Sequence, residues 1–236
     1  MKKHGKKYEK AAPLVDRTKL HTVEEAVALL KKVAYAKFDE TVNLDLRLGV
    51  DPRQADQQVR GTVALPHGTG KKVRVLVFAK GDKLREAEEA GADVAGGAEL
   101  VQKVLEGFLD FDAAISTPDM MRDVGKLGKV LGPRNMMPNP KAGTVTADVK
   151  SAIESLKAGR IEYKLDRLAN MHLVVGKMSF DEAKLAENIN AVVEAIQKAR
   201  PASIKANYLR TVCLSSTMSP GIRIAVTSGA TAGAAG

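Results

Sequence analysis

Short stretches of the chain alternate between apolar and polar residues. From Val42 to Val50 every second residue is Val or Leu, and most residues between them are polar or charged. A period of two places one face of a β-strand in a core and the other face in water. The same reasoning predicts further strands at 58–65, 161–165, 171–175 and 208–216, with a turn at 166–170 joining 161–165 to 171–175.

Two segments have apolar residues at the three- and four-residue spacing of an amphipathic helix. The first covers 22–36, and Thr22 and Glu25 are placed to form a capping box at its start. The second covers 180–200. We expect it to be capped near Ser179 and stopped by Pro201.

Between these outer segments the pattern changes. Short apolar runs at 73–78, 92–95 and 111–116 alternate with expected helices at 83–90, 99–108 and 149–158. Alternating strands and helices favour a parallel sheet that is buried on both faces. The predicted fold class is therefore α/β with two domains. A discontinuous α+β domain (split βαβ-like) covers 1–67 and 160–228, a Rossmann-like parallel-sheet domain is inserted at 68–159, and 229–236 forms a disordered tail.

The charge balance of the chain indicates which kinds of partner it binds. The chain has 37 Lys and Arg against 28 Asp and Glu, a formal net charge of +9, and most of the excess lies in the outer segments. Such an excess favours RNA, DNA or an anionic membrane face. Aromatic residues make up only 4%, which argues against a base-stacking platform. No apolar run is long enough to cross a bilayer, and residues 1–10 lack the apolar segment of a secretory signal. We therefore expect a cytoplasmic protein with no membrane partner.

Catalytic and metal-binding patterns are missing from the sequence. Its four histidines have no metal-ligand spacing, and no nucleophile-elbow motif occurs. The single cysteine, Cys213, is mid-strand and expected to be an inert core thiol. We therefore expect no enzyme activity, no cofactor and no metal site. The histidines are His4, His21, His67 and His172.

Two glycine- and lysine-rich segments suggest phosphate binding. Residues 67–72 look like the end of a P-loop, but Leu65 occupies the place of its first glycine and a strand follows instead of a helix. The second segment, 125–140, has glycines and prolines that predict an extended loop with defined turns. Its cations Lys126, Lys129 and Arg134 would either meet phosphate or keep the loop soluble, and spacing alone leaves both open.

The second segment and its continuation, GKLGKVLGPRNMMPNPKAGTVT, closely resemble the signature loop of the ribosomal protein L-one family, bacterial type. The stretches AKFDETVNLDLRLGVDPRQADQQVRGTVALPHGTGK, VRVLVFAKGDKLREAEEAGAD, AGRIEYKLD and SSTMSPG are also similar to family segments, so the resemblance covers roughly 1–226. We call 125–140 the signature segment. Its family-like residues are Gly125, Gly128, Lys129, Gly132, Pro133, Arg134, Pro138, Asn139 and Pro140.

The resemblance implies a structural RNA-binding protein of the large ribosomal subunit. It would bind 23S-type ribosomal RNA at the mobile stalk, near the place where deacylated tRNA leaves. The implied partners are this RNA, the departing tRNA and the protein's own messenger RNA, whose translation it would repress; the free protein would be a cytoplasmic monomer. An alternative is an enzyme that binds a nucleotide with the inserted α/β domain, and the missing glycine fingerprint argues against it.

The resemblance also implies which residues contact RNA. Cations would neutralise phosphates, hydroxyls would bond to 2′-hydroxyl groups, and Phe38 and Met218 would lie against sugar or base. Without the resemblance, core positions are the favoured interpretation of Phe38 and Met218. The main candidates are Lys37, Phe38, Thr41, Thr217 and Met218, and the further ones are Arg53, Lys164, Asp166, Arg167, His172, Ser215 and Ser219.

The sequence departs from the family pattern at two glycine positions. Ser219 stands where the family usually has Gly after the Thr-Met pair, and it fits only if its backbone avoids positive φ. Asn135 stands where the signature segment usually has Gly. Asparagine tolerates the left-handed region better than most residues, so this change is expected to matter less.

Overall fold

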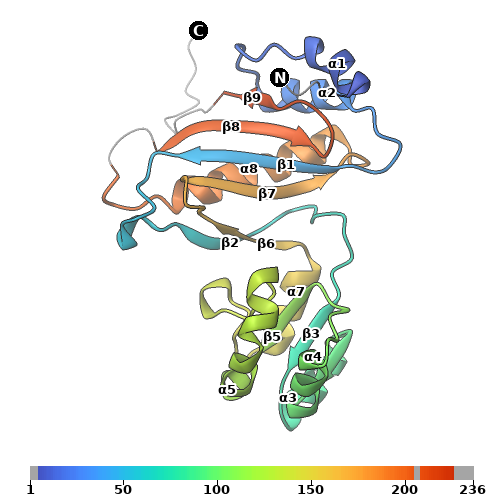
Figure 1. The fold of residues 1–236 in the computed structure, drawn as a ribbon, viewed down its shortest axis with the longest axis vertical. Helices are drawn as coiled ribbons and strands as arrows, with labels where there is room; N and C mark the ends of the chain where they lie inside the picture. The colour runs from blue at the N-terminus through green and yellow to red at the C-terminus, as the bar shows by residue number, and fades with distance from the viewer. Residues whose placement is uncertain (1–4, 205–207, 226–236) are drawn as a thin grey trace. The chain divides into compact units, whose positions relative to one another are not determined.

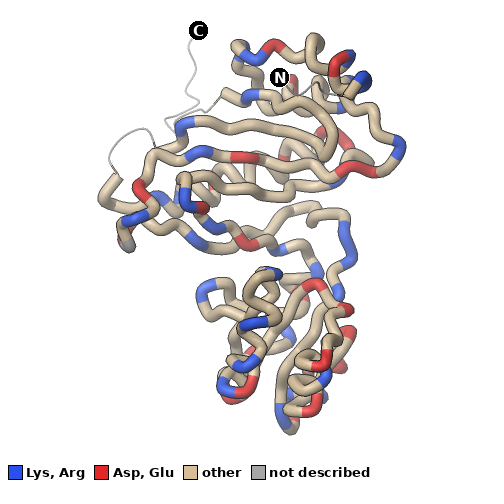
Figure 2. Tube along the Cα trace, viewed as in Figure 1, with Lys and Arg blue, Asp and Glu red and all other residues tan. Residues whose placement is uncertain are grey.

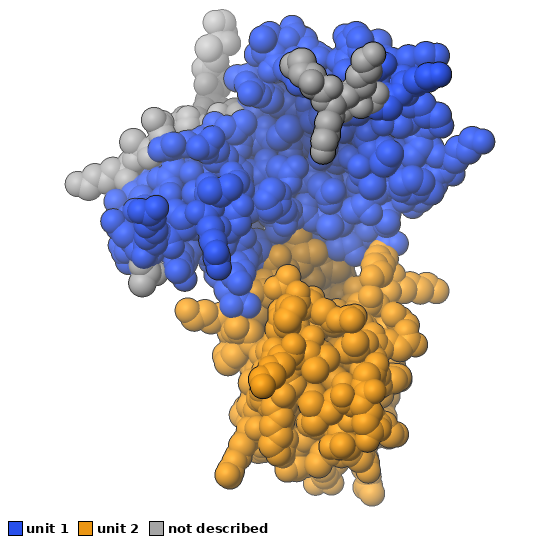
Figure 3. Space-filling model, in the orientation of Figure 1, with its two compact units in different colours: residues 1–70, 163–236 blue, residues 71–162 orange. Residues whose placement is uncertain are grey.

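The structure is a computed structural model that describes residues 5–204 and 208–225 (Figure 1). The chain forms two compact units (Figure 3): unit 1 is residues 1–70 with 163–236, and unit 2 is residues 71–162. Parallel and antiparallel sheets occur together with helices, which confirms the mixed α/β class. The domain bounds given above stay a prediction, and the expected tail at 229–236 lies outside the described residues.

Unit 1 contains a four-stranded antiparallel sheet in the order β7-β1-β8-β9. Its buried face packs against helices α2 and α8 (Figure 1). On β1 the alternating residues Val42, Leu44, Leu46 and Leu48 are buried, as the period of two predicts. The strands are β1 (Thr41–Leu48), β7 (Asn170–Lys177), β8 (Leu209–Ser216) and β9 (Ile222–Ile224), and the helices are α2 (Val23–Val33) and α8 (Glu182–Lys198).

Smaller elements complete the outer segments. Strands β2 (Arg60–Ala64) and β6 (Arg160–Lys164) form a two-stranded sheet, so the turn at 166–170 connects strands of different sheets. Three short helices, α1 (Lys6–Ala11), η1 (Ala12–Leu14) and η2 (Ala55–Gln57), lie in the outer segments as well.

Local signals located the start of one helix and missed the start of the other. The capping box at α2 is confirmed: the Thr22 hydroxyl accepts the Glu25 N–H at 3.2 Å, and the Glu25 carboxylate accepts the Thr22 N–H at 3.3 Å. Helix α2 ends at Val33, earlier than expected, because Ala34 is extended. The expected cap at Ser179 is wrong. Helix α8 begins at Glu182, and the Ser179 side chain instead donates to Asp39 at 2.9 Å.

Unit 2 contains a parallel sheet in the order β4-β3-β5, which confirms the parallel pairing expected for the middle of the chain. The central strand is buried on both faces. Leu76 and Phe78 belong to one core cluster, while Val75 and Val77 belong to another. The strands are β3 (Val75–Phe78), β4 (Val94–Gly96) and β5 (Ala113–Ser116), and the main helices are α3 (Asp82–Glu89), α4 (Ala98–Leu105) and α7 (Val149–Lys157).

The signature segment is helical for most of its length, so the expected extended loop is wrong. Leu127 and Leu131 are four residues apart and both are buried in the unit 2 core. Helical turns bring such residues to one side, where their burial outweighs the low helix propensity of the glycines. The helical turns of the segment are η4 (Gly125–Leu127), α6 (Gly128–Leu131) and η5 (Gly132–Arg134); η3 (Pro118–Met120) and α5 (Met121–Val124) precede it, and η6 (Pro140–Ala142) begins at its last residue.

Asn135 ends the helical part of the signature segment in the left-handed conformation, with φ 55°. The expectation that asparagine tolerates this backbone is therefore in keeping with the structure. Within residues 5–204 and 208–225, no helix is both long enough and apolar enough to span a membrane.

Candidate nucleic-acid interface

Glu40 connects the loop before β1 to the loop after β8. It is only 1% exposed, and its carboxylate accepts the N–H of Ala36 at 3.2 Å and the N–H of Met218 at 3.0 Å. The hydroxyl of Ser216 donates to the same carboxylate. A buried carboxylate is stable only when such donors satisfy it, so this group fixes both loops relative to each other.

The backbone of Met218 is held at both of its polar groups while its side chain faces outward. Its N–H is bound by Glu40, and its carbonyl accepts the Tyr35 hydroxyl at 2.7 Å. Met218 is 48% exposed, and Phe38 in the facing loop is 57% exposed. The core positions favoured from residue type alone are therefore wrong for both. Two large apolar groups on a fixed backbone are suited to covering a ligand surface.

Polar residues are close in sequence to Phe38 and Met218 and are hydrogen-bonded to one another. The Thr41 N–H donates to the Thr217 hydroxyl at 3.2 Å, and Lys177 Nζ donates to the Thr41 hydroxyl at 2.8 Å. Lys37 is exposed and carries the positive charge nearest to Phe38 in sequence. We call the group Lys37, Phe38, Thr41, Thr217 and Met218 the Met218 edge.

Ser219 keeps a negative φ, because the positive-φ residues other than glycine in the described chain are Asn135 and Ala169. Its hydroxyl accepts the Ser216 N–H at 2.9 Å and donates to the Pro220 carbonyl at 3.2 Å. The loop therefore does not require the glycine that is usual in the family, and serine adds hydrogen bonds of its own.

From the Met218 edge, the polar face of the four-stranded sheet extends along β1. We call this the open face, since α2 and α8 pack on the other one. At its centre, His172 Nδ1 lies 2.7 Å from Asp45 Oδ1, and the Ser215 hydroxyl donates to Asp45 Oδ2 at 3.5 Å. Two of the expected RNA contacts thus surround one carboxylate. The open face consists of Asn43, Asp45, Arg47, His172, Val174, Thr211, Cys213 and Ser215.

Cys213 is half-buried on the open face instead of lying fully in the core. Burial, and then the negative charge of Asp45, raise the pKa of its thiol. A raised thiol pKa reduces the fraction of reactive thiolate, and the expected inert character of Cys213 stays a prediction.

The far end of the open face contains the turn at 166–170. The Asp166 carboxylate accepts the N–H groups of Leu168 at 2.8 Å and Asn170 at 2.7 Å. Burial opposes ionisation, but these hydrogen bonds outweigh it and lower the pKa of Asp166. The Asp166 carboxylate therefore stabilises its own turn, and the neighbouring Arg167 is exposed. Lys164 is exposed on β6, in the two-stranded sheet, and Arg53 lies in the loop after β1.

A comparison with protein families finds a match to the model of the ribosomal protein L1p/L10e family over residues 30–220. The chain belongs to this family. The match begins within α2 and ends at Pro220, so it includes both loops of the Met218 edge. Its members are structural RNA-binding proteins of the ribosome and not enzymes. Membership therefore makes this chain a ribosomal protein that binds ribosomal RNA, as the resemblance implied.

The signature segment, which carries the family resemblance most clearly, lies in unit 2. Lys126 pairs with Asp123 at 3.1 Å and lowers the pKa of that carboxyl, whereas Lys129 and Arg134 are exposed. Asn139 organises the following turn by accepting the Lys141 N–H at 2.8 Å. Pro138 is buried, while Gly125, Gly132, Pro133 and Pro140 are exposed and Gly128 is half-buried. Most of these residues shape the segment, and its cations remain available to solvent.

Sequence reasoning missed Glu40 and Tyr35, the two residues that hold Met218. A glutamate between Asp39 and a strand has the pattern of an ordinary solvated charge, and its partners near residue 217 are remote in sequence. The one usable signal was that Glu40 directly precedes a strand whose first residue is an expected RNA contact. Basic residues also mark the end of the sheet where β1 ends and β8 begins (Figure 2), and two of these, Arg47 and Arg210, were not among the candidates.

Proposed function

We propose that this protein binds a folded segment of large-subunit ribosomal RNA with the open face of unit 1, and that the Met218 edge is the main contact. One observation carries the proposal: Phe38 and Met218 are exposed on loops that the buried carboxylate of Glu40 fixes in place. Apolar side chains on a rigid backbone cover a ligand surface without the entropic cost of ordering a loop.

Each residue of the Met218 edge has a separate task in this proposal. Phe38 and Met218 pack against ribose or base surfaces and exclude water from nearby hydrogen bonds. Lys37 neutralises a phosphate. The hydroxyls of Thr41 and Thr217 already bond to the protein, so they reach RNA only through their remaining lone pairs or protons. Apolar packing therefore contributes a larger share of the specificity than these hydroxyls do.

The site on the ribosome that we propose is the mobile stalk, near the exit of deacylated tRNA. A hydroxyl-radical footprint of the protein on large-subunit ribosomal RNA tests this assignment. Protection confined to one folded segment of the stalk supports the proposal. Protection elsewhere, or protection that Met218→Asp leaves unchanged, contradicts it.

We also propose that the same face binds the protein's own messenger RNA and so represses its translation, with the free protein being a cytoplasmic monomer. A folded messenger segment that presents the same backbone shape would compete for the Met218 edge. Competition between ribosomal and messenger fragments tests this step directly. Simultaneous binding of both fragments would contradict a shared site.

A further inference from the structure

A carboxylate lies at the centre of the surface that binds RNA in the proposed function. Asp45 is in the middle of β1, and its cross-strand partners are His172 on β7 and Cys213 on β8. It is the acidic member of the open face, whose other residues are neutral or basic. An acidic group repels phosphate, so its place on a surface for a polyanion calls for a physical reason.

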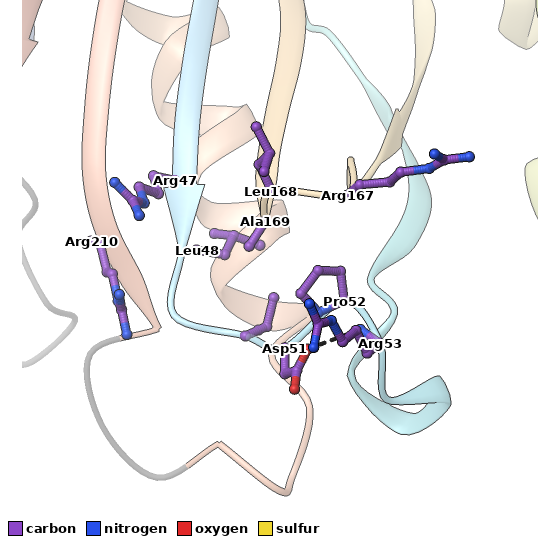
Figure 4. Close-up of a pocket in the computed structure, with 10 residues that line it drawn as sticks. Arg47, Leu48, Asp51, Pro52, Arg53, Arg167, Leu168, Ala169 and Arg210 are labelled. Atoms are coloured by element: carbon purple, nitrogen blue, oxygen red, sulfur yellow. Dashed lines mark hydrogen bonds between the residues drawn. The ribbon is translucent and has the colours of Figure 1, made fainter.

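The end of the open face has the opposite charge. Arg47 is the next residue of β1 on the same face as Asp45, since side chains of a strand alternate between faces. Figure 4 shows Arg47 and Arg210 on neighbouring strands beside a pocket of about 320 Å³, with Arg53 across it. The carboxylate of Asp45 therefore stands beside a cationic region, and it marks a place on the face where phosphate is disfavoured.

The carboxylate of Asp45 accepts a hydrogen bond from the ring of His172. Asp45 Oδ1 lies 2.7 Å from His172 Nδ1, the length of a hydrogen bond to a charged acceptor. An ionised carboxylate has no proton to donate, so Nδ1 is the ring atom that carries the proton in this contact. In the neutral ring the other nitrogen, Nε2, then has a free lone pair and acts as an acceptor.

Nε2 of His172 is available to a ligand. Within the described part of the chain it has no hydrogen bond, and its charged neighbour Asp166 Oδ2 is 3.9 Å away, beyond hydrogen-bond distance. The Asp166 carboxylate already accepts hydrogen bonds from Leu168 and Asn170 in its own turn. The His172 side chain is 65% exposed, so a group of the RNA can reach it.

Ser215 is oriented by the same carboxylate. Its hydroxyl donates to Asp45 Oδ2 at 3.5 Å, a longer and therefore weaker contact than that of His172. A hydroxyl whose proton is directed at a carboxylate still has lone pairs to offer. Asp45 thus accepts a hydrogen bond from a side chain on each neighbouring strand, and both side chains keep an acceptor for a ligand.

We propose that Asp45 is a positioning residue that determines which groups of the RNA meet the centre of the open face. By accepting hydrogen bonds from His172 and Ser215, it leaves two acceptors there, and these accept hydrogen bonds from ribose 2′-hydroxyl groups. A phosphate oxygen has no proton to donate, whereas a 2′-hydroxyl does, and DNA lacks this group. The inference rests on the proposed function and deepens it, because the carboxylate selects ribose over phosphate and RNA over DNA.

Asp45→Asn tests the inference in the full chain with the ribosomal RNA segment that the footprint protects. If Asp45 acted through its negative charge alone, removing that charge would tighten the binding of a polyanion. If Asp45 positions His172 and Ser215, the neutral amide holds them less firmly. The Kd is then expected to rise about tenfold, the size of a lost charged hydrogen bond. The two explanations therefore differ in the sign of the change.

Single 2′-deoxy substitutions in the RNA provide the second measurement. At the nucleotide that meets His172, the substitution removes a donor and should weaken binding by the wild type about fivefold. The same substitution should weaken binding by Asp45→Asn less than about twofold, because the two changes remove one interaction. If no single substitution weakens binding by the wild type, or if each weakens binding by both proteins equally, the inference is overturned.

Nitrogen-15 NMR of the histidine rings reports on the free protein. At a pH where the ring is neutral, the proton of His172 is expected on Nδ1 in the wild type, and Asp45→Asn is expected to move it in part to Nε2. A wild-type ring with its proton on Nε2 overturns the inference. This measurement and the 2′-deoxy series in the wild type do not depend on how well the variant folds.

Glu24→Gln is the matched control for net charge. Glu24 is exposed on α2, which packs against the opposite face of the sheet. The control variant is expected to bind within about twofold of the wild type and to keep its sensitivity to 2′-deoxy substitution, since a remote surface charge contributes little at moderate salt.

The inference and the proposed function fail in different ways. If Asp45→Asn binds RNA as tightly as the control or more tightly, while Met218→Asp still weakens binding, the role of Asp45 is overturned and the RNA-binding surface stands. If the wild type does not bind the RNA segment at all, the proposed function itself fails.

Discussion

The carboxylate of Glu40 accepts a hydrogen bond from the backbone N–H of Met218 at 3.0 Å, across 178 positions of sequence. The same carboxylate also binds the Ala36 N–H and the Ser216 hydroxyl, so a single buried group holds loops from both halves of unit 1. The exposed side chains of Phe38 and Met218 depend on this group for their position.

Replacing Glu40 by Gln tests this dependence. Glutamine has one acceptor oxygen, and its amide would face donors that the carboxylate now satisfies. We expect Glu40→Gln to lower the free energy of unfolding by about 1–3 kcal/mol and to weaken RNA binding, measured by denaturant unfolding and by RNA titration. Glu88→Gln, at an exposed position of α3, is the control and should stay within about 0.5 kcal/mol of the wild type. If the two substitutions change the free energy of unfolding equally little, Glu40 does not stabilise these loops.

Met218→Asp separates binding from folding. Met218 is 48% exposed, so a polar replacement should change the free energy of unfolding by less than about 0.5 kcal/mol. A negative charge facing phosphates should nevertheless weaken RNA binding by roughly a hundredfold, which a filter-binding titration would show. Lys129→Ala in the signature segment should weaken binding far less. If Lys129→Ala weakened RNA binding as much as Met218→Asp does, the main RNA contact would not be confined to unit 1.

Ala169→Gly tests whether the turn at 166–170 is strained. Alanine at φ 64° costs about 1 kcal/mol that glycine avoids, so the substitution should raise the free energy of unfolding by roughly 0.5–1 kcal/mol. Ala152→Gly in α7, at an ordinary helical position, should lower it by about 1 kcal/mol. Thermal unfolding of the two variants compares them directly, and destabilisation by both would show that the turn is unstrained.

Ionisation of Tyr208 is expected to limit the stability of the folded protein at alkaline pH. Its hydroxyl is buried without a hydrogen-bond partner among the described residues, and burial raises the pKa of Tyr208 to about 12. Because the pKa is higher in the folded state than the ordinary value of 10.0, stability is full below pH 10 and falls as the pH rises toward 12.

Tyr208→Phe removes this ionisation. The variant should be at least as stable as the wild type at pH 7, because an unsatisfied buried hydroxyl is lost, and it should retain more stability between pH 10 and 12. Denaturant unfolding at pH 7 and pH 11 checks both expectations. A variant that is less stable at pH 7 and equally sensitive to alkali would contradict them.

Local features of the sequence were sufficient for much of the fold. The capping box at Thr22 and the alternation along β1 each depend on neighbours within a few residues, and both were predicted. The prediction of a helix cap near Ser179 was wrong because the Ser179 hydroxyl donates its hydrogen bond to Asp39, which is remote in sequence. The signature segment was misassigned because its glycines and prolines were given more weight than the four-residue spacing of Leu127 and Leu131.

The candidate site was predicted less completely, for a physical reason. Residue type alone favours burial of Phe38 and Met218, and only the resemblance to a family indicated contact with RNA. Their exposure depends on two hydrogen bonds of the Met218 backbone, whose N–H donates to Glu40 and whose carbonyl accepts from Tyr35, and no local pattern encodes them. Arg210 was missed similarly, since its direction follows from a bulge in the pairing of two distant strands.

The distance in sequence between Glu40 and its partners has a consequence during synthesis. A growing chain that has not yet reached β8 contains Lys37, Phe38 and Glu40. It lacks the Ser216 hydroxyl and the Met218 N–H, which donate hydrogen bonds to Glu40 in the folded protein. The Met218 edge therefore forms only after the chain has been synthesised as far as Met218, so a shorter translation product lacks this surface.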